Sequence, residues 1–229
     1  MIGNKIEKLE SEIQRLAYDM GATRIGFANM EDAYNKAPFR FEEPGKLLTG
    51  ISIGMDKEDA LVDGLPITDE EYRTDHYVHK IGRALRIGDR IAEMLIENGF
   101  RAIRLAHPPK DSQRTGLYKM VARYAGMGWI GKNHLLITPD HGPRLALATV
   151  LTNAPTTSTG KPMEQLCRGC TLCIDICPVN AFEDMPLDES DPLKSFVPGL
   201  CGAFRGTINP TLWGGCGLCV KVCPYGQPK

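Results

Sequence analysis

The chain has 229 residues and a formal net charge of −1, and its hydrophobic and charged fractions are 42% and 24%. This length allows one large or two small domains with a sizeable core, and the composition is that of an ordinary globular protein. A net charge so close to zero gives no general argument for nucleic acid or an anionic membrane as a partner. The charged N-terminus does not resemble a signal peptide, and no apolar run approaches the roughly 20 residues of a spanning helix. We therefore expect a cytoplasmic protein that binds neither membrane nor nucleic acid.

Helices and strands alternate along the first 155 residues. Apolar residues at intervals of three and four predict helices over residues 5–20, 75–98 and 118–125. Short apolar runs predict strands over residues 23–28, 51–55, 100–105 and 145–152. Proline and glycine predict loops within 31–50 and 56–72. This alternation predicts a layered α/β or α+β fold.

A linker-like segment divides the chain. Residues 153–165 combine Pro, Thr, Ser and Gly, which are typical of connecting segments. We place the domain boundary there. The prediction is an α+β domain over residues 1–155, followed by a smaller domain over residues 160–229.

All eight cysteines lie in the predicted second domain, between Cys167 and Cys223. Scattered cysteines in a secreted chain would predict disulfides, whereas clustered cysteines without a signal peptide predict metal binding. The first four cysteines follow the bacterial ferredoxin pattern Cys-x2-Cys-x2-Cys-x3-Cys-Pro. They are Cys167, Cys170, Cys173 and Cys177.

A second, incomplete run of the same type follows. It consists of Cys216, Cys219 and Cys223 before a proline, and Cys201 can supply the missing ligand. In two-cluster ferredoxins the fourth cysteine of each run ligates the other cluster. The rule predicts two [4Fe–4S] clusters, one held by Cys167, Cys170, Cys173 and Cys223 and the other by Cys177, Cys201, Cys216 and Cys219. A pair of zinc sites is the alternative, because zinc also binds Cys-x2-Cys pairs.

The first domain contains one glycine-rich segment, residues 125–138, around the sequence Gly126-Met127-Gly128-Trp129-Ile130-Gly131-Lys132-Asn133. Closely spaced glycines allow the backbone to approach a ligand, and Lys132 would then be free to meet an anionic group. The alternative is an ordinary glycine-rich turn between a helix and a strand. Composition alone favours that alternative.

Together with Gly142-Pro143-Arg144, Val150-Leu151-Thr152 and the ferredoxin pattern, the glycine-rich segment resembles the epoxyqueuosine reductase family. The resemblance runs from about residue 5 to the C-terminus and is densest over residues 120–224. The family is cobalamin-dependent and is related to the catalytic core of reductive dehalogenases. Its N-terminal domain has a nitroreductase-like fold modified to hold cobalamin, with one cluster close to the corrin.

The resemblance also implies a cofactor site in this chain. Residues 128–135 would line the cobalamin pocket, and residues 141–144 would lie near it. Lys132 and Asn133 would contact phosphate or amide groups of the cofactor. The cofactor-binding residues implied in this way are Gly128, Trp129, Ile130, Gly131, Lys132, Asn133, His134, Leu135, His141, Gly142, Pro143 and Arg144.

Two departures weaken the transfer of the family's activity. Family members carry a catalytic acid in a Val-Asp-Thr-Ala-Pro-like stretch, whereas Asp111 stands near that place here without the flanking pattern. Many members continue past the ferredoxin module, whereas this sequence ends six residues after Cys223. We therefore leave the catalytic residue unassigned and do not expect epoxyqueuosine to be the substrate.

Other polar residues have less specific interpretations. Tyr118 and Tyr124 could donate protons, but helical packing is the favoured interpretation of both. His107 could border the pocket, and His76 and His79 are interpreted as parts of a solvated first helical turn.

The resulting prediction is an oxygen-sensitive, cobalamin-dependent iron–sulfur oxidoreductase. A low-potential donor such as a ferredoxin or flavodoxin would reduce the clusters, which would reduce cobalt for reaction with a small substrate. One alternative is reductive activation of another corrinoid protein. The other is a ferredoxin-like electron carrier without a corrinoid, whose N-terminal domain serves only for docking.

Overall fold

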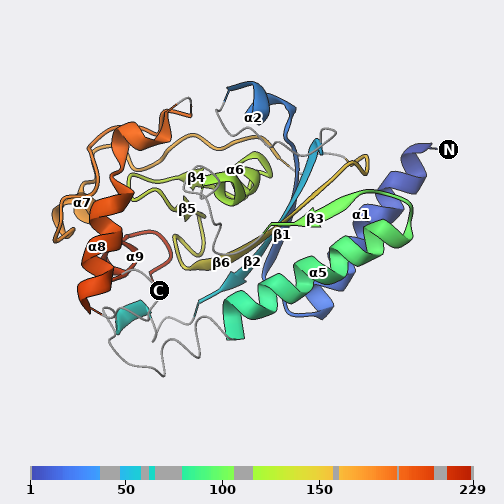
Figure 1. Ribbon diagram of the computed structural model, residues 1–229, viewed down its shortest axis with the longest axis horizontal. Coiled ribbons are helices and arrows are strands. Elements are labelled where there is room, and N and C mark those ends of the chain that lie inside the picture. Colours follow the sequence, from blue (N-terminus) through green and yellow to red (C-terminus); the bar gives the residue numbers. More distant parts are fainter. Residues whose placement is uncertain are drawn as a thin grey trace.

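The structure is a computed structural model that describes residues 2–36, 47–57, 62–64, 79–105, 116–156, 160–189, 191–208 and 216–227. Its centre is a sheet of four antiparallel strands in the order β1-β2-β6-β3 (Figure 1). The strands are β1 (Arg24–Asn29), β2 (Thr49–Asp56), β3 (Ala102–Arg104) and β6 (Leu145–Thr152). Every residue of β6 is buried, because both faces of the sheet are covered.

Two long helices cover one face of the sheet, α1 (Ile2–Asp19) and α5 (Gly82–Glu97). Each places apolar residues on one side at helical spacing, such as Ile13 and Ala17 on α1 and Ile91 and Leu95 on α5. These residues pack against Ile51 and Val150 and their neighbours in the two central strands. They form the larger of the two main cores.

The opposite face carries α6 (Leu117–Tyr124) and, beyond it, the hairpin of β4 (Trp129–Ile130) and β5 (Leu136–Ile137). The helix can lie close to the sheet because small residues face it. A Cβ atom at Gly50 on β2 would lie 2.6 Å from Cγ1 of Val121. Leu147 and Leu151 complete the second core on this side.

The predicted elements of the first domain are confirmed where the structure describes them. The helices and strands predicted over residues 5–20, 23–28, 51–55, 100–105, 118–125 and 145–152 correspond to α1, β1, β2, β3, α6 and β6. The helix predicted over 75–98 begins, as α5, at Gly82 after a π-helical turn at residues 79–81, and residues 75–78 lie outside the described part.

Two features of the first domain were not predicted from the sequence. The sequence predicted loops within residues 31–50 without assigning a helix there, and the structure has a short helix, α2 (Glu31–Lys36), at the start of that range. The hairpin of β4 and β5 was missed because each strand has only two residues, too few for an alternating pattern.

The cysteine-rich module lies on the α6 side of the sheet, away from α1 and α5 (Figure 1). It contains α7 (Leu172–Asp175), a 3-10 helix (Pro192–Ser195), α8 (Pro198–Ile208) and α9 (Leu218–Lys221). Helices α7 and α9 pack against each other. The molecule is therefore a mixed α/β layer structure with the module packed on one face.

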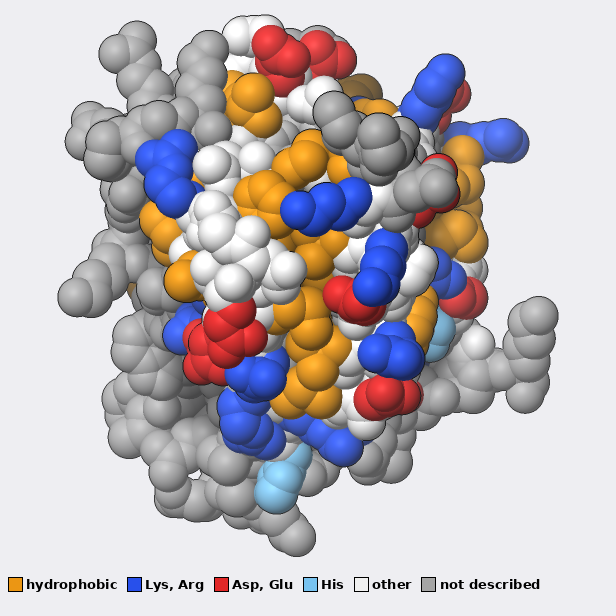
Figure 2. Space-filling model, turned by 90° about the vertical axis from the view of Figure 1, so that its right-hand side faces the viewer, with side chains coloured by type: hydrophobic (Ala, Val, Ile, Leu, Met, Phe, Trp, Pro, Cys, Tyr) orange, Lys and Arg blue, Asp and Glu red, His pale blue; other side chains and the backbone are white. Residues whose placement is uncertain are grey.

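The face formed by α1 and the end of α5 exposes hydrophobic side chains. Figure 2 shows them as a strip with Lys and Arg on both sides and Asp and Glu interspersed. A pocket beside α1 is lined by residues of that helix, of the segment after α5 and of the segment after β6, namely Lys5, Ile6, Lys8, Leu9, Glu12, Asn98, Phe100 and Pro155. None of the described helices is long and apolar enough to cross a membrane.

The close contact between β2 and α6 gives a stability prediction. Gly50→Ala should destabilise the protein by about 1–3 kcal/mol, because the added methyl group overlaps Val121 in a packed core. The midpoint of thermal unfolding, measured on anaerobically prepared protein, should fall. Gly199→Ala on α8 is the control, because nothing lies within 4 Å of its Cβ position. The double change Gly50→Ala with Val121→Ala should recover part of the loss. Equal effects of Gly50→Ala and Gly199→Ala would contradict this account of the packing.

Candidate metal centre

The two cysteine runs have closely similar local structures. In the first, the backbone N–H groups of Ile174 and Asp175 donate to the carbonyl of Thr171 at the start of α7. In the second, those of Val220 and Lys221 donate to the carbonyl of Gly217 at the start of α9. Each short helix therefore carries a middle cysteine and is followed closely by the last cysteine of its run, which lies before a proline.

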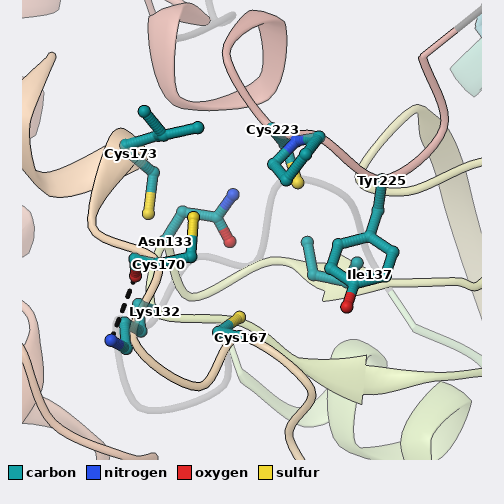
Figure 3. A pocket seen from close by; sticks show the side chains of 10 residues that line it. Lys132, Asn133, Ile137, Cys167, Cys170, Cys173, Cys223 and Tyr225 are labelled. Carbon is teal, nitrogen blue, oxygen red and sulfur yellow. Dashed lines mark hydrogen bonds between the residues drawn. The ribbon is translucent and has the colours of Figure 1, made fainter.

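Four thiols line one pocket, and they come from both runs. Cys167, Cys170 and Cys173 enter it from the first run and Cys223 from the second. Figure 3 shows their sulfur atoms around a common space. The pocket contains about 340 Å³ of space between atoms, part of which opens to solvent. These are the four cysteines that the crossing rule assigned to the first cluster.

The remaining cysteines form a second group around Cys219. The charges that act on its thiol are those of Cys216, Cys201, Cys173 and Cys177, in decreasing order. Three of these four are the partners that the crossing rule assigned to Cys219. The fourth, Cys173, belongs to the first group, so the two groups lie close to each other.

Burial and the neighbouring thiols raise the cysteine pKa values. The pKa is about 11 for Cys173 and for Cys223, and about 12 for Cys219. The largest cause is the loss of water around the thiolate, followed for Cys173 and Cys219 by repulsion between thiolates. A bound cation removes that repulsion, and metal binding releases the thiol protons. The donor set therefore fits iron–sulfur clusters.

The turn between β4 and β5 connects the first domain to three separate segments of the module. The Lys132 ammonium group donates to the carbonyls of Arg168 (2.8 Å) and Cys170 (3.0 Å). The Asn133 amide donates to the carbonyl of Cys219 (3.1 Å). Nε2 of His134 lies 2.7 Å from the hydroxyl of Ser195. Three consecutive side chains thus reach the first run, the second run and the segment between them.

The expectation that Lys132 is free for an anionic ligand is wrong. Its side chain is only 5% exposed, and it forms an ion pair with Asp184 in addition to its two carbonyl contacts. Lys132 and Asn133 also line the pocket of the four thiols. Their observed partners are therefore the cysteine loops.

Other parts of the chain occupy the space beside the glycines of this segment. A Cβ atom at Gly128 would lie 2.0 Å from the carbonyl oxygen of Ile137, and one at Gly131 would lie 2.8 Å from the Ile137 side chain. The segment connects α6 to the hairpin, as the simpler interpretation of the sequence proposed. Trp129 is fully buried, and the rings of Trp129 and Tyr225 pack nearly perpendicular to each other at a centroid distance of 4.8 Å.

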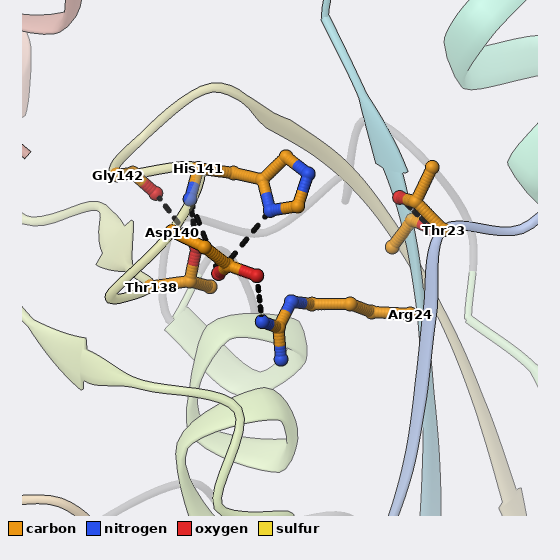
Figure 4. A network of polar contacts seen from close by, with 7 residues as sticks. Thr23, Arg24, Thr138, Asp140, His141 and Gly142 are labelled. Atoms are coloured by element: carbon orange, nitrogen blue, oxygen red, sulfur yellow. Dashed lines mark hydrogen bonds and ion pairs between the residues drawn. The ribbon is translucent and has the colours of Figure 1, made fainter. Parts of the chain in front are cut away.

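Residues 138–142 form a tight turn that contacts the end of the module. Gly142 has a left-handed backbone (φ +53°), and a Cβ atom there would lie 1.9 Å from the carbonyl oxygen of Tyr225. Figure 4 shows the carboxylate of Asp140 between Arg24 and His141. Burial alone would raise the pKa of Asp140, but the hydrogen bonds from Arg24 and His141 outweigh it and hold the pKa well below its usual range.

Arg144 completes this contact between the domains. Its guanidinium group, 2% exposed, lies 3.1 Å from both Asp63 and the side-chain oxygen of Gln227. The Gln227 amide in turn donates to the carbonyl of Cys223 (2.7 Å). Arg144 therefore supports the crossing cysteine from the side of the first domain.

His134 is neutral at ordinary pH. Burial, helped by the nearby Lys119 charge, lowers its pKa to about 4. The ring stacks on Phe196 at a centroid distance of 5.0 Å. Its surroundings are those of a packing residue with one hydrogen bond to Ser195.

The structure describes only some of the polar residues considered from the sequence. Asp111 lies outside the described residues, as do His107, which was expected to border the pocket, and His76. Tyr124 lies in α6, where its hydroxyl donates to Glu189 (2.8 Å), and burial and that carboxylate raise its pKa. Sequence reasoning missed Tyr225, Asp184, Ser195 and Gln227, because no metal-ligand or glycine pattern marks them.

A model of the 4Fe-4S dicluster domain matches residues 166–227, which contain all eight cysteines. The match supports iron–sulfur clusters over zinc. An epoxyqueuosine reductase of Leadbetterella byssophila is 29% identical over 219 residues, or 90% of this chain and 68% of that protein. The chain is therefore similar to epoxyqueuosine reductases along most of its length. Other relatives of the same name match shorter parts: the Bacillus cereus protein is 47% identical over 64 residues, 28% of this chain and 17% of that protein.

Solved structures show the same fold. An epoxyqueuosine reductase from Bacillus subtilis has a TM-score of 0.62 and 23% identity over 97% of this chain and 66% of its own. A catabolic reductive dehalogenase in complex with 3-bromo-4-hydroxybenzoic acid has a TM-score of 0.69 and 19% identity over 94% of this chain and 31% of its own. The chain thus spans about two thirds of the reductase structure and about a third of the dehalogenase.

The crossed arrangement of the thiols gives a second prediction. Cys223→Ala should damage the cluster at Cys167, Cys170 and Cys173 rather than the one at its sequence neighbours, because its thiol faces the first group. Cys201→Ala should damage the other cluster. EPR spectra of the reduced variants, together with iron content, would distinguish the two losses. Loss of the same EPR signal in both variants would contradict the assignment.

Proposed function

We propose that the chain is a cobalamin-dependent iron–sulfur oxidoreductase. In this proposal, two [4Fe–4S] clusters pass electrons to the cobalt of a corrinoid in a nitroreductase-like N-terminal domain, for reduction of a small substrate. The observation that carries the proposal is the position of the first thiol group. Its pocket is completed by Lys132, Asn133 and Ile137 of the N-terminal domain, so a cluster there lies at the boundary between the domains. A carrier that only docks through this domain would not need that arrangement.

Cobalamin binding is supported by the similarity to related proteins, and the residues present support it only in part. One similar structure, a reductive dehalogenase with a TM-score of 0.67, is described as suggesting a mechanism for B12-dependent dehalogenation. In this chain, the space beside Gly128 and Gly142 is filled by Ile137 and Tyr225. Residues 128–135 and 141–144 therefore fit a rigid support for the first cluster better than a surface shaped to the cofactor. When bound, the corrinoid would supply the nucleophilic cobalt chemistry.

The protein's own part is to hold the clusters in series. A low-potential donor of the ferredoxin or flavodoxin class would reduce the second cluster, at Cys177, Cys201, Cys216 and Cys219. Helices α7 and α9, which carry Cys173 and Cys219, pack against each other, so the first cluster would lie next in line. The N-terminal domain would then receive the electron through the side of the pocket formed by residues 132–137.

Anaerobic reconstitution tests the proposal in two steps. We expect about eight iron and eight sulfide per chain, because eight thiols fill two cubane clusters. Titration of the reconstituted protein with cobalamin should then give a saturable one-to-one complex. Reduction of the bound cobalt through the clusters should change the cobalt EPR signal. Stoichiometric zinc without iron–sulfur absorption would refute the central claim. If both clusters assemble but cobalamin does not bind, a ferredoxin-like electron carrier would be the remaining function. If the protein instead binds a separate corrinoid protein, reductive activation of that protein would be favoured.

A separate prediction concerns epoxyqueuosine as a substrate. One related structure is a complex of epoxyqueuosine reductase with an epoxyqueuosine-modified tRNA stem loop. We expect little turnover of that substrate here, because a positioned general acid typically contributes about 10²–10⁴-fold and the residues that place it are missing around Asp111. The measurement is turnover of epoxyqueuosine-containing tRNA by reconstituted protein, with a family member as control. Comparable rates that collapse in Asp111→Ala would identify Asp111 as the acid and contradict the prediction.

A further inference from the structure

Lys132 places a buried positive charge beside the first thiol group. Its ammonium nitrogen lies 3.0 Å from the carbonyl oxygen of Cys170 and 2.8 Å from that of Arg168. Both carbonyls belong to the loop that carries two of the four thiols, and Lys132 lines their pocket (Figure 3). With a side chain only 5% exposed, this charge is poorly screened by water.

The counter-charge of Lys132 stands in a different environment. The Asp184 carboxylate pairs with the ammonium group, but its side chain is 56% exposed. Water screens an exposed carboxylate strongly, so it cancels only part of the field that the ammonium group exerts inward. The pair therefore directs a net positive field toward the pocket.

The next residue makes an equivalent contact without a charge. The Asn133 amide donates to the carbonyl of Cys219, a member of the second thiol group. The turn between β4 and β5 thus supports both cysteine runs through backbone carbonyls, and it gives a charged donor to the first group and a neutral donor to the second. Mechanical support alone does not explain a buried charge at one of two similar contacts, because burying a charge costs free energy.

We propose that Lys132 is a positioning residue that raises the reduction potential of the first cluster. Reduction adds one electron to the cluster and takes up no proton, so the cluster becomes more negative by one charge. A nearby buried cation stabilises the reduced state more than the oxidised state, and net charge is one of the factors that set cluster potentials. The result is to draw electrons toward the N-terminal domain. This inference rests on the proposed function in one respect, the presence of the clusters.

The test is an EPR-monitored redox titration of the anaerobic holoprotein, with signals assigned by Cys223→Ala and Cys201→Ala. Lys132→Met removes the charge and should lower the first-cluster potential, with an about tenfold change in the reduction equilibrium, about 59 mV for a one-electron couple. Asp184→Asn removes the counter-charge and should raise that potential. The second-cluster potential should move far less in both variants.

A matched control separates this effect from general surface charge. Asp188→Asn removes a carboxylate of the same module that pairs with Lys194 rather than Lys132, and it should leave the first-cluster potential nearly unchanged. If Lys132→Met prevents assembly of the first cluster, Asp184→Asn still tests the proposal, because its side chain is exposed.

Opposite shifts in Lys132→Met and Asp184→Asn would support the electrostatic role, since a purely structural role predicts no rise in Asp184→Asn. Shifts in the same direction, or unchanged potentials with about eight iron bound, would overturn it. Wild-type protein that assembles no clusters would instead refute the proposed function, so the two failures are distinguishable.

Discussion

The backbone contact between residues 141–142 and residues 225–226 fixes the position of the cysteine module on the first domain. A Cβ atom at Gly142 would lie 1.9 Å from the carbonyl of Tyr225, and one at Gly226 would lie 2.2 Å from the backbone of His141. Neither position can carry a side chain unless the two loops separate. Cys223 precedes Tyr225 by two residues, so this contact also places the thiol that crosses to the first group.

The buried polar residues of the first domain depend on the module. Lys132, Asn133, His134 and Arg144 are each less than 10% exposed, and each has a polar partner in residues 168–227. A buried polar group without a partner costs free energy, and a buried charge costs more. Without the module these residues would lose partners at the surface that the module covers. The two predicted domains are therefore energetically coupled, although the sequence between them looks like a linker.

The sequence predicted those parts of the structure that a local pattern encodes. Periodic apolar residues located α1, α5 and α6, and the spacing of the cysteines indicated which thiols should cross between the runs. The role of Lys132 could not be read in this way. A lysine among glycines is compatible with an anionic ligand, and only the tertiary structure brings the carbonyls of Arg168 and Cys170 within reach. The same holds for Asp184 and Gln227, which are ordinary surface residues in the sequence.

The short turn between β4 and β5 determines how the first domain acts on each cysteine run. The N–H of His134 donates to the carbonyl of Gly131, and His134 itself has a left-handed backbone (φ +57°). That conformation is uncommon for a residue with a side chain, and it turns the chain tightly enough for residues 132, 133 and 134 to point to three different segments. A longer, flexible loop could reach the same carbonyls, but it would not hold them at fixed distances. Because cluster potentials depend on nearby charges and hydrogen bonds, this rigid turn gives the first domain control over the potentials as well as the positions of the two thiol groups.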